Sequence, residues 1–314
     1  MTGTASVLAD VVAIPVTPFS RGDVDLDRYG VILRRIVDAG VHVVTPNGNT
    51  SEFYALTPEE RRDLLRATGD VLGASTAIVA GIGHDIPTAI AEGTVAAEHG
   101  AEFAMIHQPV HPYVSKAGWV DYHATIAAAL RHMGMVLYVR NTWVTADMLR
   151  ELLDRAPNLV GVKYAVPDAV AFARIRQATG ADELTWIAGL AEPYALSYAV
   201  HGAVGFTSGL VNVNPGLSLE LLASLKRGDL VRAAQLSGRI DRFEQLRAEH
   251  TSANNVSVIK EALYQLGLCS REVRAPSSEL DADGRTEVAG ILVDWGTEFD
   301  LDCGTPRLTE PMPA

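Results

Sequence analysis

Residues 135–163 read MVLYVRNTWVTADMLRELLDRAPNLVGVK, and this stretch indicates how the whole chain folds. Its two apolar runs, Met135–Arg140 and Leu159–Lys163, have the length and β-branched content of strands. Between them, Thr145–Ala156 has apolar residues at helical spacing. Both runs are continuously apolar, which is typical of parallel strands covered on both faces. The stretch therefore predicts one strand–helix–strand unit.

The same unit repeats along the first two-thirds of the chain. Eight apolar runs are predicted strands: Val11–Thr17, Val41–Pro46, Thr76–Ile82, Glu102–His107, Met135–Arg140, Leu159–Lys163, Leu184–Gly189 and Ala203–Ser208. Seven segments with helical period separate them: Leu26–Ala39, Pro58–Leu72, Ile86–His99, Trp119–His132, Thr145–Ala156, Ala169–Thr179 and Glu192–His201. Eight such units fit a closed (β/α)8 TIM barrel of about 250 residues better than an open doubly wound sheet, which usually has about six strands. We therefore predict an α/β fold with a (β/α)8 barrel.

Residues 1–227 are predicted to form the barrel, because an outer helix at Pro215–Arg227 follows the eighth strand. Three more helical segments follow without new strands: Asp229–Ala248, Val256–Leu266 and Arg285–Trp295. Residues 228–296 are therefore predicted to be a C-terminal helical extension. Residues 297–314 contain three prolines and no apolar period, so we expect a flexible tail there.

Composition excludes several classes of partner. The 314 residues are 48% hydrophobic, and the formal net charge of −12 comes without a basic stripe of the kind that nucleic acid or anionic lipid requires. No apolar run reaches the ~18 residues of a membrane span, and no basic residue precedes the apolar N-terminal stretch. Cys269 and Cys303 are far apart in the sequence and form no CxxC pair. We therefore predict a soluble, cytoplasmic protein without nucleic-acid, membrane or structural zinc partners.

Lys163 is the strongest candidate for catalysis, because active sites of such barrels lie at the C-terminal ends of the strands. The chain has four lysines, and this one alone terminates an apolar strand. Burial in an apolar barrel mouth would lower its pKa and make neutral amine available to attack a ketone and form a Schiff base. The alternative is a structural ion pair between Lys163 and a carboxylate.

Two other predicted strand ends carry polar residues. Tyr138 ends the strand before Lys163, and its phenol could shuttle protons if both side chains point inward; it could also be a core aromatic with a satisfied hydroxyl. The loop after the second strand contains Gly48, Asn49 and Thr50, whose amides and side chains could hold a carboxylate, although this composition also suits an ordinary turn. GxGxxG and Walker patterns are absent, so nucleotide binding has no support.

Three histidines lie at or just after the third and fourth strands: His84, His107 and His111. A metal-dependent aldolase would place ligands in this region, but HxH and HExxH spacings are absent. We therefore predict no metal site and no cofactor.

Together these residues resemble the dihydrodipicolinate synthase / N-acetylneuraminate lyase family of Schiff-base lyases. The resemblance runs from about residue 11 to 295 and rests on four motifs: IPVTPF at 14–19, GNTSE at 48–52, LTPEER at 56–61 and GVK at 161–163. It implies a barrel with a helical tail, assembled as a homotetramer or dimer. It also implies that Lys163 is the Schiff-base lysine and Tyr138 the catalytic tyrosine. Asn49 and Thr50 would then bind the carboxylate of a 2-oxo acid, with Val204 near the pyruvyl unit.

Several positions depart from the synthases of that family. Trp143 stands where those enzymes have an arginine that binds the second substrate's carboxylate. Asn49 replaces a relay threonine, and His111 corresponds to a tyrosine that the neighbouring subunit contributes to the substrate site. The loop SEFYAL at 51–56 resembles the GEFFSL stretch of 5-dehydro-4-deoxyglucarate dehydratases, and Arg140 would suit a distal carboxylate. These features favour an acidic keto-deoxy sugar as the small-molecule substrate.

The predicted reaction begins when neutral Lys163 attacks the C2 carbonyl of a 2-oxo acid, and the resulting iminium then serves as an electron sink. Aldol cleavage and dehydration share this intermediate, so both an aldolase and a dehydratase fit. One alternative is condensation of pyruvate with an aldehyde, as in 4-hydroxy-tetrahydrodipicolinate synthase. The other is a barrel that binds a 2-oxo acid without catalysing a reaction.

Overall fold

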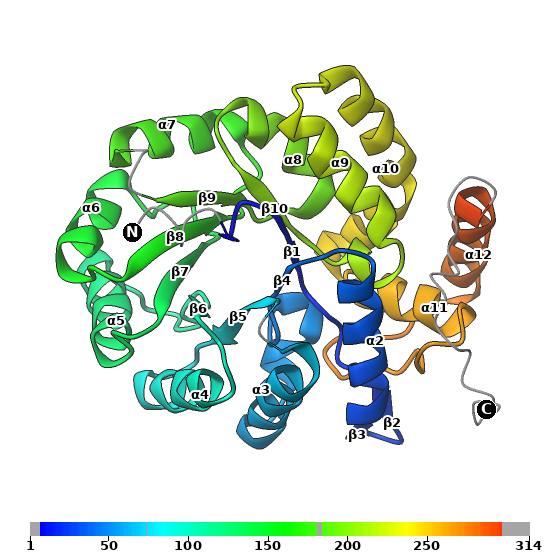
Figure 1. Cartoon of the computed structure of the whole chain (residues 1–314), viewed down its shortest axis with the longest axis horizontal. Helices are drawn as coiled ribbons and strands as arrows, with labels where there is room; N and C mark the ends of the chain where they lie inside the picture. The colour runs from blue at the N-terminus through cyan, green and yellow to red at the C-terminus, as the bar shows by residue number, and fades with distance from the viewer. Residues whose placement is uncertain (1–6, 74, 181–183, 297–314) are drawn as a thin grey trace.

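A computed structural model, in which residues 7–73, 75–180 and 184–296 are described, has a closed barrel at its centre (Figure 1). Its eight parallel strands follow the order β1-β10-β9-β8-β7-β6-β5-β4. They are β1 (Val11–Ala13), β4 (Val43–Val44), β5 (Ala77–Ile82), β6 (Phe103–Ile106), β7 (Gly134–Val139), β8 (Leu159–Tyr164), β9 (Thr185–Ala188) and β10 (Gly205–Ser208). The barrel closes where β1 pairs with both β10 and β4. The predicted (β/α)8 barrel is confirmed, and each predicted run contains or overlaps one strand, although β1 and β4 are much shorter than predicted.

Helices between consecutive strands form the outer layer. They are α2 (Leu26–Asp38), α3 (Pro58–Leu72), α4 (Ile86–Glu98), α5 (Lys116–Ala129), α6 (Ala146–Arg155), α7 (Ala169–Thr179) and α8 (Ala191–Val200), with α9 (Pro215–Lys226) after the last strand. Local sequence explains where they begin. Thr57 and Glu60 form a capping box at the start of α3, and the Thr145 side chain accepts a hydrogen bond from the Met148 amide at the start of α6.

Short elements occupy three of the loops. The antiparallel pair β2 (Phe19–Ser20) and β3 (Asp23–Val24) lies between β1 and α2. Two 3-10 helices, η1 (Asn49–Ser51) and η2 (Phe53–Ala55), follow β4, and η4 (Leu210–Asn212) follows β10. The loops after β4 and β10 lie at the C-terminal end of the barrel, where the sequence predicts the active site.

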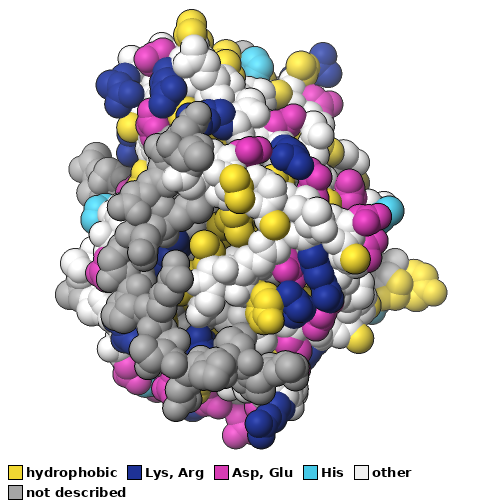
Figure 2. Space-filling view, turned by 90° about the vertical axis from the view of Figure 1, so that its right-hand side faces the viewer, with side chains coloured by type: hydrophobic (Ala, Val, Ile, Leu, Met, Phe, Trp, Pro, Cys, Tyr) yellow, Lys and Arg dark blue, Asp and Glu magenta, His cyan; other side chains and the backbone are white. Residues whose placement is uncertain are grey.

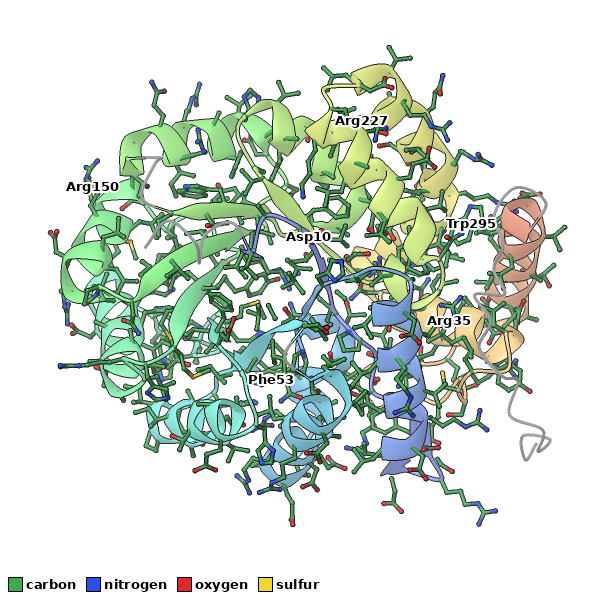
Figure 3. The ribbon with its side chains drawn as sticks, viewed as in Figure 1. Asp10, Arg35, Phe53, Arg150, Arg227 and Trp295 are labelled. Atoms are coloured by element: carbon green, nitrogen blue, oxygen red, sulfur yellow. The ribbon has the colours of Figure 1, made fainter. Side chains whose placement is uncertain are left out.

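The C-terminal extension consists of α10 (Leu230–Ser252), α11 (Ser257–Gln265) and α12 (Ala282–Gly296), and Figure 1 shows the last two outside the ring of barrel helices. α10 packs against α8 and α9. Trp295 of α12 lies against α10 and donates a hydrogen bond to the Arg239 carbonyl at 3.2 Å (Figure 3). Near its C-terminal end, α10 is kinked at His250 and Thr251, which have left-handed backbone conformations. The predicted tail, 297–314, lies outside the described residues.

The apolar core has two parts. A small cluster fills the interior of the barrel: Leu8, Val12, Val43, Val79, Phe103, Met105, Val136, Tyr138, Ala165 and Ile187. A larger cluster lies between the strands and the surrounding helices and extends to α10, α11 and α12. The interior is therefore a packed core, and polar side chains gather above it, at the barrel mouth.

The surface agrees with the mixed charge of the sequence. Figure 2 shows a face on which the described Lys and Arg side chains lie among Asp and Glu side chains. None of the helices in the described part of the chain combines the length and the apolar character needed to cross a membrane.

Candidate active site

A cavity of about 750 Å³ opens at the C-terminal ends of the barrel strands. Its wall includes five of the residues predicted from the sequence: Asn49, Thr50, Tyr138, Arg140 and Lys163. They come from the loop after β4, from β7 and its end, and from β8. These segments are distant in the sequence, and they meet because a parallel barrel brings all the carboxyl ends of its strands to one rim.

Lys163 lies inside the barrel with 3% of its surface exposed. It is in register with Tyr138 of β7, and its Nζ lies 4.7 Å from the centre of the Tyr138 ring. Burial, and secondarily the positive charge of Arg140, lower the pKa of Lys163 to about 7. Within the described ranges no carboxylate forms an ion pair with this lysine, which argues against the structural alternative. An amine with this pKa is about half neutral at pH 7 and can attack a carbonyl carbon.

Gly189, at the end of β9, makes room for the Lys163 side chain. A Cβ at this position would lie 2.9 Å from Cγ of Lys163 and 2.9 Å from the carbonyl oxygen of Tyr164. The sequence analysis did not single out Gly189, although it ends the seventh predicted strand. Its contact with Lys163 depends on the register between β8 and β9, which sequence alone does not give.

Tyr138 is 5% exposed and lies directly beside the predicted carboxylate-binding loop. The Asn49 side-chain amide donates a hydrogen bond to the Tyr138 hydroxyl oxygen at 3.0 Å. Burial raises the pKa of Tyr138, while Arg140 and Asn49 partly oppose that shift. The phenol is therefore protonated at neutral pH. Because Asn49 donates to its oxygen, the Tyr138 hydroxyl hydrogen is available to a group in the cavity.

The loop that carries Asn49 is fixed against the segment after β1. Thr17 Oγ1 donates to the Ser51 carbonyl at 2.8 Å, and Ser51 Oγ donates to the Pro15 carbonyl at 2.5 Å. A Cβ on Gly48 would lie 2.5 Å from Cγ2 of Ile14, so a side chain here would push the loop away. Gly48 was predicted to contact substrate, but it packs behind the loop and is not among the residues that line the cavity.

Asn49 and Thr50 both line the cavity. Asn49 Oδ1 is buried and has no hydrogen-bond partner among the described residues. Thr50 is 4% exposed. Buried polar atoms are normally hydrogen-bonded, so an unpartnered one beside a cavity is available to a ligand.

Arg140 and Tyr54 lie at the same cavity, nearer to solvent than Lys163. β7 ends at Val139, one residue before the predicted strand end, so Arg140 is the first residue beyond the strand, and it is exposed. Tyr54 of η2 was missed by the sequence analysis, and its hydroxyl donates to the Gln108 carbonyl at 3.3 Å. Burial and the neighbouring Tyr138 raise the pKa of Tyr54 to about 12, and Arg140 opposes the shift. Arg140 can therefore donate hydrogen bonds to a bound molecule, while the Tyr54 hydroxyl, whose hydrogen is directed to Gln108, can accept one.

The placement of Val204 near the substrate requires a correction. Val204 is 44% exposed and precedes β10, so it lies at the N-terminal end of that strand, away from the mouth. Thr207, three residues further on, lines the cavity instead. Phe206 belongs to the outer cluster, so alternation along the strand turns Thr207 inward. That alternation could have identified Thr207 from the sequence, had the strand boundary been known.

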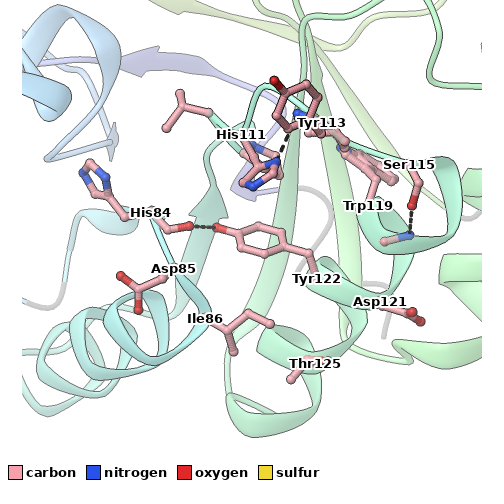
Figure 4. A pocket seen from close by; sticks show the side chains of 14 residues that line it. His84, Asp85, Ile86, His111, Tyr113, Ser115, Trp119, Asp121, Tyr122 and Thr125 are labelled. Carbon is pink, nitrogen blue, oxygen red and sulfur yellow. Dashed lines mark hydrogen bonds between the residues drawn. The ribbon is translucent and has the colours of Figure 1, made fainter.

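His111 lies in a second cavity, outside the barrel mouth (Figure 4). It is exposed on the loop between β6 and α5, and its Nδ1 accepts a hydrogen bond from the Tyr113 amide at 3.1 Å. Within one chain His111 therefore does not reach the cavity that contains Lys163. A contribution from a neighbouring subunit stays a prediction.

The other two histidines of this region are separated from each other by Phe53. His107 is buried and stacks on Phe53 with ring centres 4.0 Å apart, and its Nε2 lies 2.7 Å from the Asn47 carbonyl. Burial lowers the pKa of His107 to about 3. His84 also stacks on Phe53, at 4.8 Å. In the described part of the chain, no group of three or more His, Cys, Asp and Glu residues is arranged to hold a metal ion.

Trp143, which the family resemblance predicts at the position of the synthases' arginine, packs outside the cavity. Its ring lies 6.4 Å from that of Trp119 in an edge-to-face arrangement, and it joins the outer apolar cluster. Trp143 is not among the residues that line the mouth.

Comparisons with known proteins agree with this geometry. A relative in Phenylobacterium zucineum named 4-hydroxy-tetrahydrodipicolinate synthase is 30% identical over 90% of this chain and 95% of its own. A relative in Methylobacterium radiotolerans named "Probable 5-dehydro-4-deoxyglucarate dehydratase" is also 30% identical, over 90% of this chain and 94% of its own. The crystal structure of dihydrodipicolinate synthase from Oceanobacillus iheyensis superimposes with a TM-score of 0.90 at 36% identity, covering 94% of this chain and 98% of that one.

The family model of the dihydrodipicolinate synthetases matches residues 7–294, nearly the whole of the described chain. Members of the family are lyases that act on small molecules. The two names carried by relatives at the same identity leave the specific reaction open. The barrel, its mouth and the sequence matches lead to one conclusion: this chain is a member of the dihydrodipicolinate synthetase family.

Proposed function

We propose that the protein is a lyase that forms a Schiff base between Lys163 and a 2-oxo acid, without a metal or other cofactor. The observation that carries the proposal is the buried position of Lys163, in contact with Tyr138 and with a pKa lowered to about 7. A buried neutral amine beside a protonated phenol has what carbinolamine formation and dehydration require, a nucleophile and a proton donor.

In the proposed mechanism, the substrate carboxylate binds at Asn49 and Thr50, which directs its C2 carbonyl toward Lys163. The Nζ lone pair attacks C2, and one of the protons on Nζ moves to the carbonyl oxygen to give a carbinolamine. Tyr138 then protonates the departing hydroxyl, so that water leaves and an iminium forms. Transfer of a proton from C3 to the Tyr138 phenolate then moves electrons into the iminium, gives an enamine and restores the phenol. From the enamine, a C–O bond to a neighbouring hydroxyl breaks or a C–C bond to an aldehyde forms, whereas in aldol cleavage the iminium takes up the electrons of the breaking C3–C4 bond directly.

We propose an acidic keto-deoxy sugar as the substrate, processed by an aldolase or a dehydratase. The support is Arg140 at the cavity wall, whose guanidinium can bind a distal carboxylate by two hydrogen bonds, with Tyr54 beside it. A relative with a dehydratase name adds weight to this class. Condensation of pyruvate with an aldehyde is the second candidate, because other relatives carry the synthase name. The position of Trp143 away from the mouth argues against it.

We also propose that the protein is a homo-oligomer, either a tetramer or a dimer. Val110 and Tyr113 are 65% and 87% exposed on the loop that carries His111. The two side chains line the same cavity as Val114, so they lie close together, and apolar side chains that gather on a surface mark interfaces when the patch is large enough. A cytoplasmic location remains a prediction from cysteine usage. Light scattering on Tyr113→Asp and wild-type protein would test the assembly, and an unchanged mass would remove this loop from the interface.

The chemistry can be tested by incubating the protein with pyruvate and borohydride. Reduction of the Schiff base should fix one pyruvyl unit per chain, and peptide mapping should locate it at Lys163. Lys163→Ala should keep the fold, as judged by circular dichroism, and should give no adduct; Lys226→Ala is the matched control. An undiminished adduct in Lys163→Ala would remove this lysine from its proposed role.

Turnover separates the enzyme from the non-catalytic alternative. A panel of keto-deoxy sugar acids, and pyruvate with an aldehyde, should be assayed under the same conditions as the trapping experiment. Adduct formation with turnover identifies a lyase, and the product distinguishes cleavage, dehydration and condensation. Adduct formation without turnover on any of them would favour a barrel that only binds 2-oxo acids.

A further inference from the structure

The C-terminal extension holds the loop that carries Asn49 through a buried ion pair. Glu52 follows η1 directly, and its Oε2 accepts a hydrogen bond from Lys260 Nζ of α11 at 2.5 Å. Its Oε1 accepts one from the Arg274 amide at 2.9 Å. The Glu52 and Lys260 side chains are 3% and 0% exposed. Both carboxylate oxygens are therefore used by residues of the extension, more than 200 positions further along the chain.

Further contacts from the extension converge on the same region. Lys260 Nζ also donates to the Glu272 carbonyl at 2.7 Å, and it lies 4.0 Å from the centre of the Phe19 ring. The Arg274 guanidinium stacks on that ring at 4.4 Å and binds both carboxylate oxygens of Glu60, at 2.6 and 2.7 Å. Burying a lysine and a glutamate is costly unless their geometry and other hydrogen bonds compensate. Here both carboxylate oxygens of Glu52 accept a hydrogen bond, and Lys260 Nζ donates two, to Glu52 and to the Glu272 carbonyl.

The ion pair is connected to the candidate catalytic groups by two hydrogen bonds. The Glu52 amide donates to the Asn49 carbonyl at 3.0 Å, which closes the η1 turn. The Asn49 side chain in turn donates to the Tyr138 hydroxyl at 3.0 Å. Glu52 itself has a left-handed backbone conformation, with φ 59°, which a glutamate does not adopt without support. Its side-chain contacts to Lys260 and Arg274 supply that support.

We propose that Lys260 is a positioning residue for the reaction: through Glu52 it holds the Asn49–Ser51 turn in the shape that binds the substrate carboxylate and orients Tyr138. The inference rests on the proposed function. It makes the extension part of the active site, because without Lys260 the turn loses one of the two side-chain contacts that fix its C-terminal end.

The first test replaces the pair by neutral residues of similar size, in the double variant Glu52→Gln with Lys260→Met. Gln keeps an acceptor for the Arg274 amide, and Met fills the space of the lysine stem, so the fold should be retained. The pyruvate concentration that gives half-maximal trapping at Lys163 should rise about tenfold, the size expected when a hydrogen-bonded carboxylate contact is loosened. The pH midpoint of trapping should not move, because the surroundings of Lys163 are unchanged.

The matched control is Glu261→Gln with Arg271→Met, which removes the 2.8 Å ion pair between these residues and the 3.9 Å contact of Glu261 with Arg285, all within the same extension and without touching the loop. It should leave half-saturation by pyruvate unchanged. Glu52→Gln alone is a second test. The pyruvate concentration that gives half-maximal trapping depends only on the folded molecules, so it can be measured even if part of the sample unfolds. This variant should raise half-saturation in the same direction as the double variant.

The outcomes separate this inference from the proposed function. If wild-type protein is not trapped at Lys163, the proposed function itself fails. If the wild type is trapped and the double variant reaches half-saturation at the same pyruvate concentration, Lys260 is not a positioning residue. An equal rise in the control variant would assign the effect to general loosening of the extension. Complete unfolding of both Glu52 variants, with the control folded, would assign the pair to stability alone and overturn the proposal.

Discussion

Raising the pH from 6 to 8 should increase the rate at which pyruvate forms the Lys163 adduct by about tenfold, and raising it further to pH 9 should add little. With a pKa of about 7, close to one-tenth of the amine is neutral at pH 6 and about nine-tenths at pH 8. A lysine at its ordinary pKa near 10.4 would instead gain roughly a hundredfold over the same range and would continue to gain above it. The sign follows from the chemistry, because the neutral form attacks and accumulates as the pH rises through the pKa.

The assay is a timed incubation with saturating pyruvate at each pH, stopped by transfer into borohydride at one fixed pH, with the adduct counted by intact mass. Because the reduction step always occurs at the same pH, the profile reports only the attack. Arg140→Gln should move the midpoint to higher pH, since the charge that helps to lower the Lys163 pKa is lost, while Arg140→Lys should leave it in place. A rate that rises tenfold per pH unit up to pH 9 would refute the reasoning.

Three other perturbations test the remaining features of the site. Arg140→Ala should lower kcat/KM for acidic keto-deoxy sugars by roughly ten- to a hundredfold, through loss of a charge-assisted contact, and should leave pyruvate trapping unchanged above the Lys163 midpoint; equal losses on neutral substrates would count against this role. Gly189→Ala should slow trapping because its Cβ meets Lys163, whereas Gly238→Ala, with open space around it, should not. Asn49→Ala should slow trapping roughly two- to tenfold by removing the hydrogen bond to Tyr138, and Asn49→Thr should restore part of the rate; full activity in the alanine variant would exclude that bond from catalysis.

Periodicity was sufficient to predict the barrel, because eight apolar runs separated by helical segments have few other arrangements. It was also sufficient to place Lys163 and Tyr138 together, since each lies at or near the end of a predicted strand and the two strands follow one another in the sequence. Errors began where a residue's role depended on a strand boundary. Val204 falls before β10, and Thr207 takes the place at the mouth.

Contacts that do not follow from the order of the barrel strands could not be predicted. The Glu52–Lys260 pair joins the second strand–helix unit to the extension, and nothing in either local pattern indicates the other. Gly189 is a similar case, because a glycine after a strand is ordinary until the register places it against Lys163. Sequence thus identified groups that can react, while the contacts that set their geometry depend on tertiary structure.

The pairing of β1 with β10 has a consequence for how the chain is made. Val11 is translated about 200 residues before its partner Phe206, which at 5–20 residues per second is an interval of roughly 10–40 s. During that time β1 has an unpaired edge on the nascent chain, and unpaired strand edges promote association with other chains. The barrel can therefore close only late in synthesis, after β10 has left the ribosome.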